Sequence, residues 1–301
     1  MITDELCEKI IKTQNPSVVG LDTSYSYVPE EMRRGEDFCA AGEAILEFNK
    51  RIIDAVCDVV PAVKVQVAYY EMYSVEGMKA FLETLKYAKE KGLIVIADCK
   101  RNDIGATCSC YAEAYLGKKP AFPSDMLTVN GYLGSDGIKP FTKLCDENDK
   151  AVFVLVKTSN PSGGELQDRR FMSGESVYEY MGQYVESLNG IVGEYGYGRV
   201  GAVVGATYPE QGKVLREKMK KSLFLVPGYG AQGGTAEELS VCFDDSGLGA
   251  VVNSSRGIIC AYRKPKYEGL SFADAARAAC IDMRDDILSA LKGRGIKRIG
   301  K

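Results

Sequence analysis

The chain contains no histidine among its 301 residues. This absence excludes a Ser-His-Asp triad, a Cys-His pair, a histidine general base and a histidine-ligated zinc site. Acid-base chemistry is left to lysine, aspartate, glutamate, tyrosine and cysteine, or to a cofactor.

The chain also lacks long runs of one charge and any apolar window of transmembrane length. Its formal net charge is only −3, so the electrostatic pattern of a nucleic-acid or membrane binder is missing. Residues 1–11 alternate acidic, basic and apolar side chains and do not form the apolar segment of a signal peptide. These absences favour a cytoplasmic protein that acts on a small molecule.

Ten cysteines are scattered along the chain. Without an export signal, we expect them to be reduced thiols. Cys108 and Cys110 form an isolated C-x-C pair, and whether this pair has a metal or redox role stays open.

Eight short apolar runs recur along the chain and predict eight strands. They span residues 18–22, 62–67, 93–98, 126–129, 151–156, 200–206, 223–226 and 250–253. Because the runs are mainly apolar, both faces of the sheet should be covered by helices. Apolar residues at three- and four-residue steps between the runs, as from Ile45 to Val59, predict those helices. The pattern is typical of an α/β protein with a (β/α)8 TIM barrel, here a single domain over residues 1–301; a doubly wound open sheet is the alternative.

Polar residues lie in or follow several of the predicted strands. They are Asp22, Lys64, Asp98, Lys100, Thr158, Ser159, Ser255 and Arg256. Because the active site of a β/α barrel lies at the carboxyl ends of its strands, we expect these side chains to meet on one rim.

The segment from Asp98 to Asp103 carries the strongest chemical signal. Asp98 and Lys100 are two residues apart and should project to the same side of the strand end, while Asp103 lies beyond the turn. Flanking carboxylates would keep Lys100 protonated, which disfavours a Schiff base and favours a proton donor. Such a site suits loss of carbon dioxide followed by protonation of the carbanion. The alternative is a structural ion pair next to a helix N-terminus.

A glycine-rich segment follows the seventh predicted strand. It begins at Pro227 and includes Gly230 and Gly233. Closely spaced glycines let backbone N–H groups approach an anion, and the loops after strands seven and eight are the usual phosphate site of this fold. Arg256 could add a bidentate charged contact. Together these residues predict a phosphate site, with a simple turn as the alternative.

Taken in order, these segments resemble orotidine 5′-monophosphate decarboxylases, specifically the longer bacterial type 2 branch. The resemblance lies in residues 19–22, 64–71, 98–107, 157–161, 204–207, 227–234 and 254–257. It implies cofactor-independent decarboxylation of orotidine 5′-phosphate to uridine 5′-phosphate, the last step of de novo pyrimidine synthesis.

The resemblance also implies roles for individual residues. Lys100 would donate the proton to C6 of the pyrimidine, Asp98 would lie beside the departing carboxylate, and Lys64 and Asp103 would complete an alternating charge array. The implied substrate contacts are Asp22 to the ribose, Ser159 to the pyrimidine, Gln232 and Arg256 to the phosphate, with Pro227 and Ser255 beside them. The residues corresponding to Asp103 and Thr107 reach into the partner's site in this family, which implies a homodimer with shared active sites.

Two residues depart from the family pattern. Asn102 stands where glycine is commoner, and Gly131 stands where proline is usual. Both are expected in turns, so they concern local backbone shape and not the assigned roles.

Two other functions are alternatives to this decarboxylase. A related group of barrels, the hexulose-phosphate synthases and keto-gulonate-phosphate decarboxylases, resembles the chain at Asp98, Lys100 and Asp103 but uses magnesium held partly by a glutamate at the end of strand two. Here that strand offers Lys64, a cation that would repel the metal. The second alternative is a sugar-phosphate or nucleotide-binding barrel that has lost catalysis.

Overall fold

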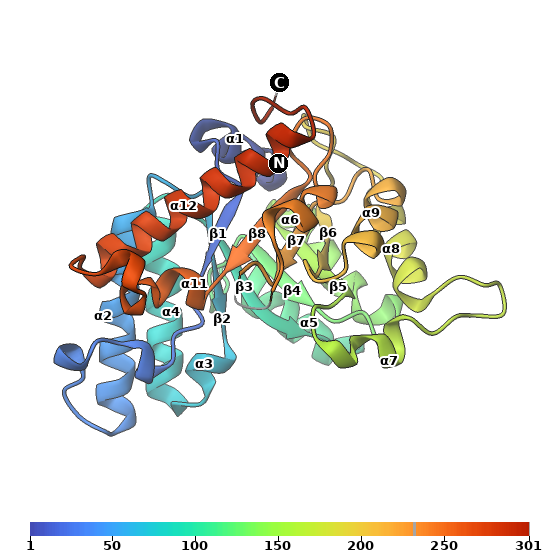
Figure 1. Cartoon of the computed structure of the whole chain (residues 1–301). Helices are drawn as coiled ribbons and strands as arrows, with labels where there is room; N and C mark the ends of the chain where they lie inside the picture. The colour runs from blue at the N-terminus through green and yellow to red at the C-terminus, as the bar shows by residue number, and fades with distance from the viewer. Residues whose placement is uncertain (231–232, 301) are drawn as a thin grey trace.

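Eight parallel strands close into a barrel in the order β1 to β8, with β8 paired to β1 (Figure 1). The computed structural model describes residues 1–230 and 233–300. The strands are β1 (Ser17–Gly20), β2 (Ala62–Gln66), β3 (Ile94–Arg101), β4 (Met126–Val129), β5 (Ala151–Lys157), β6 (Val200–Val204), β7 (Phe224–Pro227) and β8 (Ala250–Ser254). All eight predicted runs contain a strand, so the predicted (β/α)8 TIM barrel is confirmed and the open doubly wound sheet is wrong.

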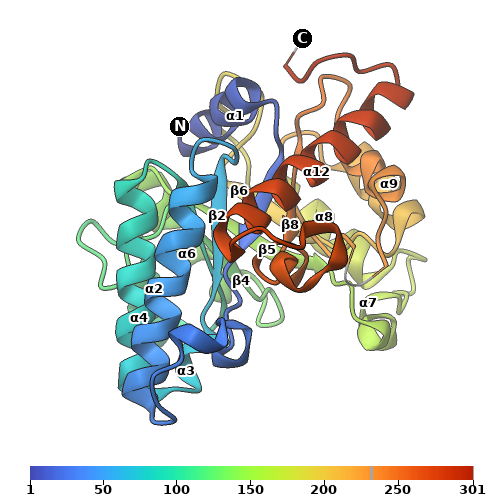
Figure 2. The same cartoon turned by 60° about the vertical axis from the view of Figure 1, so that its left-hand side comes forward.

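Helices cover the outside of the barrel and the amino ends of its strands. They are α1 (Ile2–Thr13), α2 (Phe38–Val56), α3 (Ala68–Glu71), α4 (Ser74–Glu90), α5 (Gly105–Leu116), α6 (Lys139–Asn148), α7 (Gly164–Gln167), α8 (Val177–Ser187), α9 (Pro209–Lys218), α10 (Ala236–Leu239), α11 (Arg256–Ile259) and α12 (Phe272–Gly293). The long helices α2 and α4 lie side by side (Figures 1 and 2). Their buried residues, which include Phe48 and Phe81, fall on one face of each helix, as the periodicity predicts.

The amino ends of the strands are closed by α1 and the C-terminal segment. The amide of Ile2 donates to Asp149 Oδ1 (3.0 Å), which lies just before β5. Gln14 exchanges two hydrogen bonds with the backbone of Ile299, at 3.2 and 3.1 Å. The opposite end, where the strands finish, is therefore the end available to a substrate.

Strands β3, β5, β7 and β8 run past their predicted ends, and two of these strands, β3 and β5, contain an irregularity. The pairing of β3 with β4 shifts register between Ala97 and Arg101, and β5 shifts against β6 between Leu155 and Lys157. Apolar periodicity does not reveal such bulges, which redirect side chains at the rim of a barrel.

None of the described helices combines the length and the apolar composition needed to cross a membrane.

Candidate functional site

A cavity of about 520 Å³ opens at the carboxyl ends of the strands. Strands β2 to β8 all contribute to its wall, and Asp22, two residues after β1, contributes as well. Among the predicted site residues, the structure brings together Asp22, Lys64, Asp98, Lys100, Ser159, Pro227, Ser255 and Arg256. Residues more than two hundred positions apart in the chain thus share one cavity.

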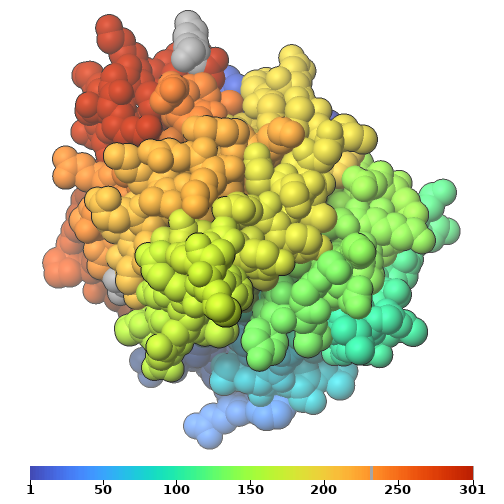
Figure 3. All heavy atoms as spheres, turned by 90° about the vertical axis from the view of Figure 1, so that its right-hand side faces the viewer, coloured from blue at the N-terminus to red at the C-terminus, as the bar shows by residue number. Residues whose placement is uncertain are grey.

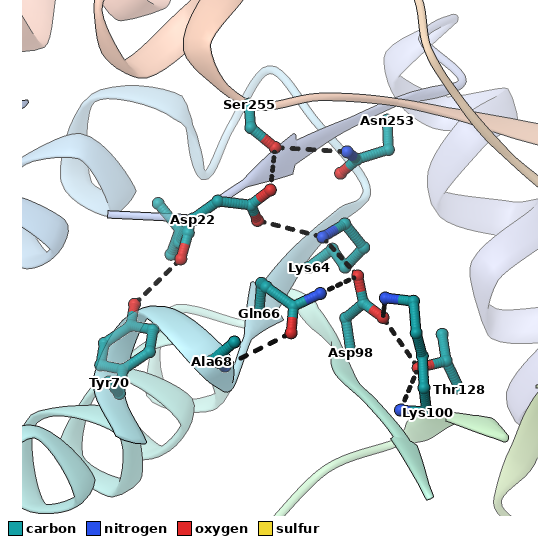
Figure 4. Close-up of polar contacts among 11 residues, drawn as sticks. Asp22, Lys64, Gln66, Ala68, Tyr70, Asp98, Lys100, Thr128, Asn253 and Ser255 are labelled. Atoms are coloured by element: carbon teal, nitrogen blue, oxygen red, sulfur yellow. Dashed lines mark hydrogen bonds and ion pairs between the residues drawn. The ribbon is translucent and has the colours of Figure 1, made fainter. Parts of the chain in front are cut away.

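Four charged side chains form an alternating row across this cavity (Figure 4). Lys64 Nζ lies 3.0 Å from Asp22 Oδ1 and 2.8 Å from Asp98 Oδ2. Lys100 Nζ lies 2.7 Å from Asp98 Oδ1. The order is therefore carboxylate, ammonium, carboxylate, ammonium, and each inner group has an opposite charge on both sides.

Lys64 is the most buried member of the row, with only 4% of its side chain exposed. Burial alone would lower its pKa, but the carboxylates of Asp22 and Asp98 outweigh burial and raise the pKa above its ordinary value. Lys64 therefore remains an ammonium group throughout the neutral range. It also occupies the space between two carboxylates that a divalent cation would need.

Asp98 is held as a carboxylate by an unusually complete set of partners. Gln66 Nε2 donates to its Oδ2 (2.9 Å) and Thr128 Oγ1 donates to its Oδ1 (2.8 Å), in addition to the two lysines. Burial alone would raise the pKa of Asp98, but Lys64 and Lys100 hold that pKa well below its usual range. The site therefore presents a fixed negative charge at all physiological pH values.

Gln66 and Thr128 were not among the predicted site residues. Gln66 follows Lys64 by two positions, and Thr128 is the one polar residue in a four-residue strand. Because alternate residues of a strand share a face, the spacing of Gln66 from Lys64 was a usable signal. Only the pairing of β2, β3 and β4 places both side chains on Asp98.

We expect the stability contributed by the Asp98 charge to disappear in acid. Its pKa is depressed in the folded protein, so the carboxylate stabilises the fold above the unfolded value of about pH 3.9 and loses this effect as the pH falls toward the folded value. Urea unfolding of wild type and Asp98→Asn should give a constant difference in unfolding free energy at neutral pH that narrows below about pH 4. If the difference in unfolding free energy stays constant below about pH 4, the lowered pKa of Asp98 is contradicted.

Lys100 reaches the cavity through a distorted backbone. Its φ of 48° lies in the left-handed region, which is uncommon for a residue with a side chain. The Lys100 N–H donates to Thr128 Oγ1 (3.0 Å), the same hydroxyl that donates to Asp98. Thr128 thus stabilises both the carboxylate and the turn that aims Lys100, and strain of this kind clusters at functional sites.

The other end of the charged row is fixed by β1 and β8. Ser255 Oγ donates to Asp22 Oδ2 (2.8 Å), and Asn253 Nδ2 donates to Ser255 Oγ (3.4 Å). Gly20 permits this approach, because a Cβ there would lie 2.0 Å from Ser255 Oγ. Asp22 is therefore shared between a lysine and a hydroxyl at the cavity wall.

Asp103 and Thr107 lie apart from the other predicted catalytic groups. The Asp103 carboxylate accepts the backbone N–H of Ile104 (2.8 Å), just before α5. Thr107 is exposed on α5. Neither residue belongs to the cavity wall that the described residues of this one chain form.

Three of the described glycines in the segment after β7 have a left-handed backbone conformation. Gly228, Gly230 and Gly233 all have positive φ, between 69° and 110°. The Gly230 and Gly233 N–H groups donate to carbonyls of the same loop, Gly234 O (2.9 Å) and Gly230 O (3.0 Å). Gln232 lies outside the described residues. Within the cavity, the group best suited to an anion is the exposed guanidinium of Arg256.

The two departures from the family pattern have local structural roles. Asn102 donates to Gly137 O (3.1 Å), which links the end of β3 to the segment before α6. Gly131 follows β4 closely, and a Cβ there would lie 2.8 Å from Met181 Cε on α8. Both residues thus shape the backbone next to the cavity.

The C-x-C pair lies on two different sides of α5. The buried Cys108 thiol contacts Gly137 O (3.6 Å), whereas Cys110 is exposed. Positions two apart on a helix do not face each other. Across residues 1–230 and 233–300, no group of three carboxylate or thiol side chains is arranged as a metal-ligand set.

Comparison with known proteins identifies clear relatives. The family model described as "Orotidine 5′-phosphate decarboxylase / HUMPS family" matches residues 17–270. The orotidine 5′-phosphate decarboxylase of Clostridium kluyveri is 44% identical over 289 residues, covering 96% of this chain and 97% of the relative.

Solved structures agree with the sequence comparison. The OMP decarboxylase of Leishmania donovani superposes with a TM-score of 0.76 at 28% identity, covering 97% of this chain and 98% of that one. The UMP synthase of the same organism gives a TM-score of 0.77 at 30% identity; the chain is covered to 96% and spans 56% of that longer protein.

Proposed function

This chain belongs to the orotidine 5′-phosphate decarboxylase / HUMPS family, and from that membership we infer that it is an orotidine 5′-phosphate decarboxylase. It is a carboxy-lyase that converts orotidine 5′-phosphate to uridine 5′-phosphate and carbon dioxide in pyrimidine biosynthesis. The observation that carries the catalytic proposal is the row of Asp22, Lys64, Asp98 and Lys100 in one cavity.

Asp98 is proposed to act on the carboxylate that leaves. With a pKa held low by two lysines, Asp98 is a permanent anion that would repel a substrate carboxylate placed beside it. Loss of carbon dioxide removes that repulsion. The interaction is therefore less unfavourable in the transition state than in the bound substrate, which is the condition for acceleration.

Lys100 is proposed to complete the reaction as the proton donor. The bond from C6 to the carboxyl carbon breaks, its electron pair stays on C6, and an Nζ proton of Lys100 forms the new C6–H bond. Water then returns a proton to the neutral amine. The contact of 2.7 Å with Asp98 keeps the Lys100 ammonium directed into the cavity beside the leaving group.

The remaining wall residues are proposed to orient the substrate. Asp22, held by Lys64 and Ser255, suits the ribose hydroxyls, and Ser159 lies where it could contact the pyrimidine. Arg256 is proposed to bind the phosphate as a fork of donors, next to Pro227 and the loop that contains Gly230 and Gly233.

The function is tested by following the ultraviolet absorbance of orotidine 5′-phosphate with purified, EDTA-treated protein. We expect the absorbance to change as uridine 5′-phosphate forms, because the proposed chemistry uses no metal. Activity restored only by added magnesium would favour the sugar-phosphate group of related barrels. Binding of the nucleotide with unchanged absorbance would instead indicate a non-catalytic binding barrel.

We propose that the active protein is a homodimer with shared sites. Asp103 and Thr107 lie outside the cavity of their own chain, at the start of α5 beside exposed Ile104. In this arrangement, Asp103 of the partner subunit would complete the row of charges beside Lys100.

Mixed dimers provide a direct test of sharing. We expect Lys100→Ala and Asp103→Ala to be nearly inactive alone, because each removes one member of every site. Co-expression should restore about a quarter of wild-type activity, since half of randomly formed dimers are mixed and one of their two sites is intact. A mixture no more active than its parents would contradict shared sites.

Three further features are proposed. The resemblance of the catalytic and loop segments supports membership in the type 2 branch. The contacts between Gln14 and Ile299 support a single domain over residues 1–301. A cytoplasmic location is proposed because all ten cysteines are free thiols.

A further inference from the structure

Lys157 is a buried charged residue that the proposed chemistry does not use. It is the last residue of β5, and none of its side chain is exposed. Its Nζ lies 2.6 Å from Asp168 Oδ1 and 4.6 Å from the centre of the Tyr208 ring. A fully buried ammonium group is costly unless a carboxylate compensates it, so this contact constrains where Asp168 can lie.

The register shift in β5 determines the direction of Lys157. Leu155 lines the cavity, whereas Val156 lies against α8, with its Cγ1 3.7 Å from the Cβ position of Gly182. Lys157 also faces α8, with Nζ 5.6 Å from the Tyr178 ring centre. Two successive side chains therefore point to the helix layer, and the next two residues, 158–159, return to the cavity wall.

The chain that follows folds back onto the end of β5. Gln167, the last residue of α7, forms two hydrogen bonds with Thr158: its Oε1 accepts the backbone N–H (3.0 Å) and its Nε2 donates to Oγ1 (2.7 Å). Asp168, the next residue, contacts Lys157. The adjacent side chains of residues 167–168 thus bind the adjacent residues 157–158 at the end of β5.

Ser159 is the residue held by this arrangement. Its carbonyl accepts a hydrogen bond from Thr207 Oγ1 (3.3 Å). Gly205 lies directly beneath it, since a Cβ there would come within 2.8 Å of the Ser159 backbone. The segment between Ser159 and α8 belongs to the yellow-green lobe at the lower centre of Figure 3, which stands out from the molecule. An exposed lobe needs such anchors if its first residues are to keep one position.

We propose that Asp168, through Lys157, is a positioning residue that holds the base-contacting part of the cavity wall, residues 158–160, in place. This inference rests on the proposed function, because the base is the pyrimidine of the nucleotide. Asp168 is 40% exposed and outside the cavity wall, so it acts through the loop and not on the substrate. Loss of the Asp168 charge leaves the buried Lys157 ammonium uncompensated. It also removes a contact that holds the loop after β5 against the end of that strand.

The test compares two ligands that share the sugar phosphate and differ in the base. In Asp168→Asn, the dissociation constant of uridine 5′-phosphate should rise about tenfold or more, because a misplaced contact loses its binding energy. The dissociation constant of ribose 5-phosphate should stay within about twofold, since Asp22 and Arg256 are untouched. Calorimetric titration measures both constants. Asp58→Asn is the matched control, because its carboxylate pairs with Arg277 (2.8 Å) and is exposed.

Gln167→Ala is the second variant and should show the same selective loss, since it removes the neighbouring anchor without leaving a buried charge. The proposal is overturned if the two dissociation constants rise equally in both variants, or if neither constant rises. Wild-type turnover of orotidine 5′-phosphate is measured first. An inactive wild type refutes the proposed function, whereas an active wild type with unselective variants refutes only the role of Asp168.

Discussion

Replacing Lys100 with alanine is expected to lower kcat by about four orders of magnitude while the protein remains folded. Lys100 Nζ lies 2.7 Å from Asp98 Oδ1, and its side chain is 46% exposed toward the cavity. The substitution removes the proposed proton donor and one of the two cations that hold Asp98 ionised. The ultraviolet absorbance of orotidine 5′-phosphate gives the rate of turnover, and circular dichroism checks that the variant is folded.

Two comparison variants sharpen this result. Lys100→Arg keeps a positive charge but presents a planar group whose proton is harder to release, so we expect it to recover little activity. Lys143→Ala changes an exposed lysine on α6 that is not part of the cavity wall, and should leave turnover unchanged. If Lys100→Ala stays within tenfold of wild type, Lys100 is not the donor.

Lys64→Met is expected to reduce both stability and activity strongly. The methionine fills similar space but leaves Asp22 and Asp98 facing each other without the ammonium that lies 3.0 and 2.8 Å from them. Removing one partner of a buried ion pair typically costs about 3–5 kcal/mol of unfolding free energy. Turnover should fall by about a hundredfold or more, because the charged row loses its geometry. Urea unfolding and absorbance assays measure the two effects.

The same substitution at an exposed pair provides the control. Lys143 is 73% exposed and lies 3.8 Å from Glu147, so Lys143→Met should change the unfolding free energy by less than about 1 kcal/mol. The double variant Lys64→Met, Asp22→Asn should regain part of the lost stability, since it removes one of the opposed carboxylates. If Lys64→Met lowers the free energy of unfolding no more than Lys143→Met does, the buried row of charges contributes little to folding.

Much of the architecture was predictable because it follows from local patterns. Each strand of the barrel is largely buried on both faces, and this produces the mainly apolar runs from which all eight strands were predicted. Asp98 and Lys100 were predictable as partners because two positions separate them. The glycine-rich segment after β7 was recognisable as a turn region, and its glycines Gly228, Gly230 and Gly233 have the positive φ values that glycine favours.

Contacts between distant segments could not be predicted in the same way. Thr128 meets Asp98 across β3 and β4, and the register shift in β3 that aims Lys100 leaves no trace in the apolar pattern. Lys157 lay within a recognised segment, yet its direction away from the cavity depends on a second shift, in β5. Such bulges are decided by side-chain packing at the rim, to which residues from many strands contribute.

By itself, the sequence determined that this protein is a β/α barrel without histidine chemistry, with lysines and aspartates at its strand ends, because burial and residue type are properties of each segment. Only the tertiary structure decided that Asp22 belongs to the row of alternating charges, that Lys64 is the buried cation between two carboxylates, and that Asp168 anchors the loop after β5. The reason is physical: the energy of an ion pair depends on distance and desolvation, and both arise only when strands far apart in the chain are brought into register.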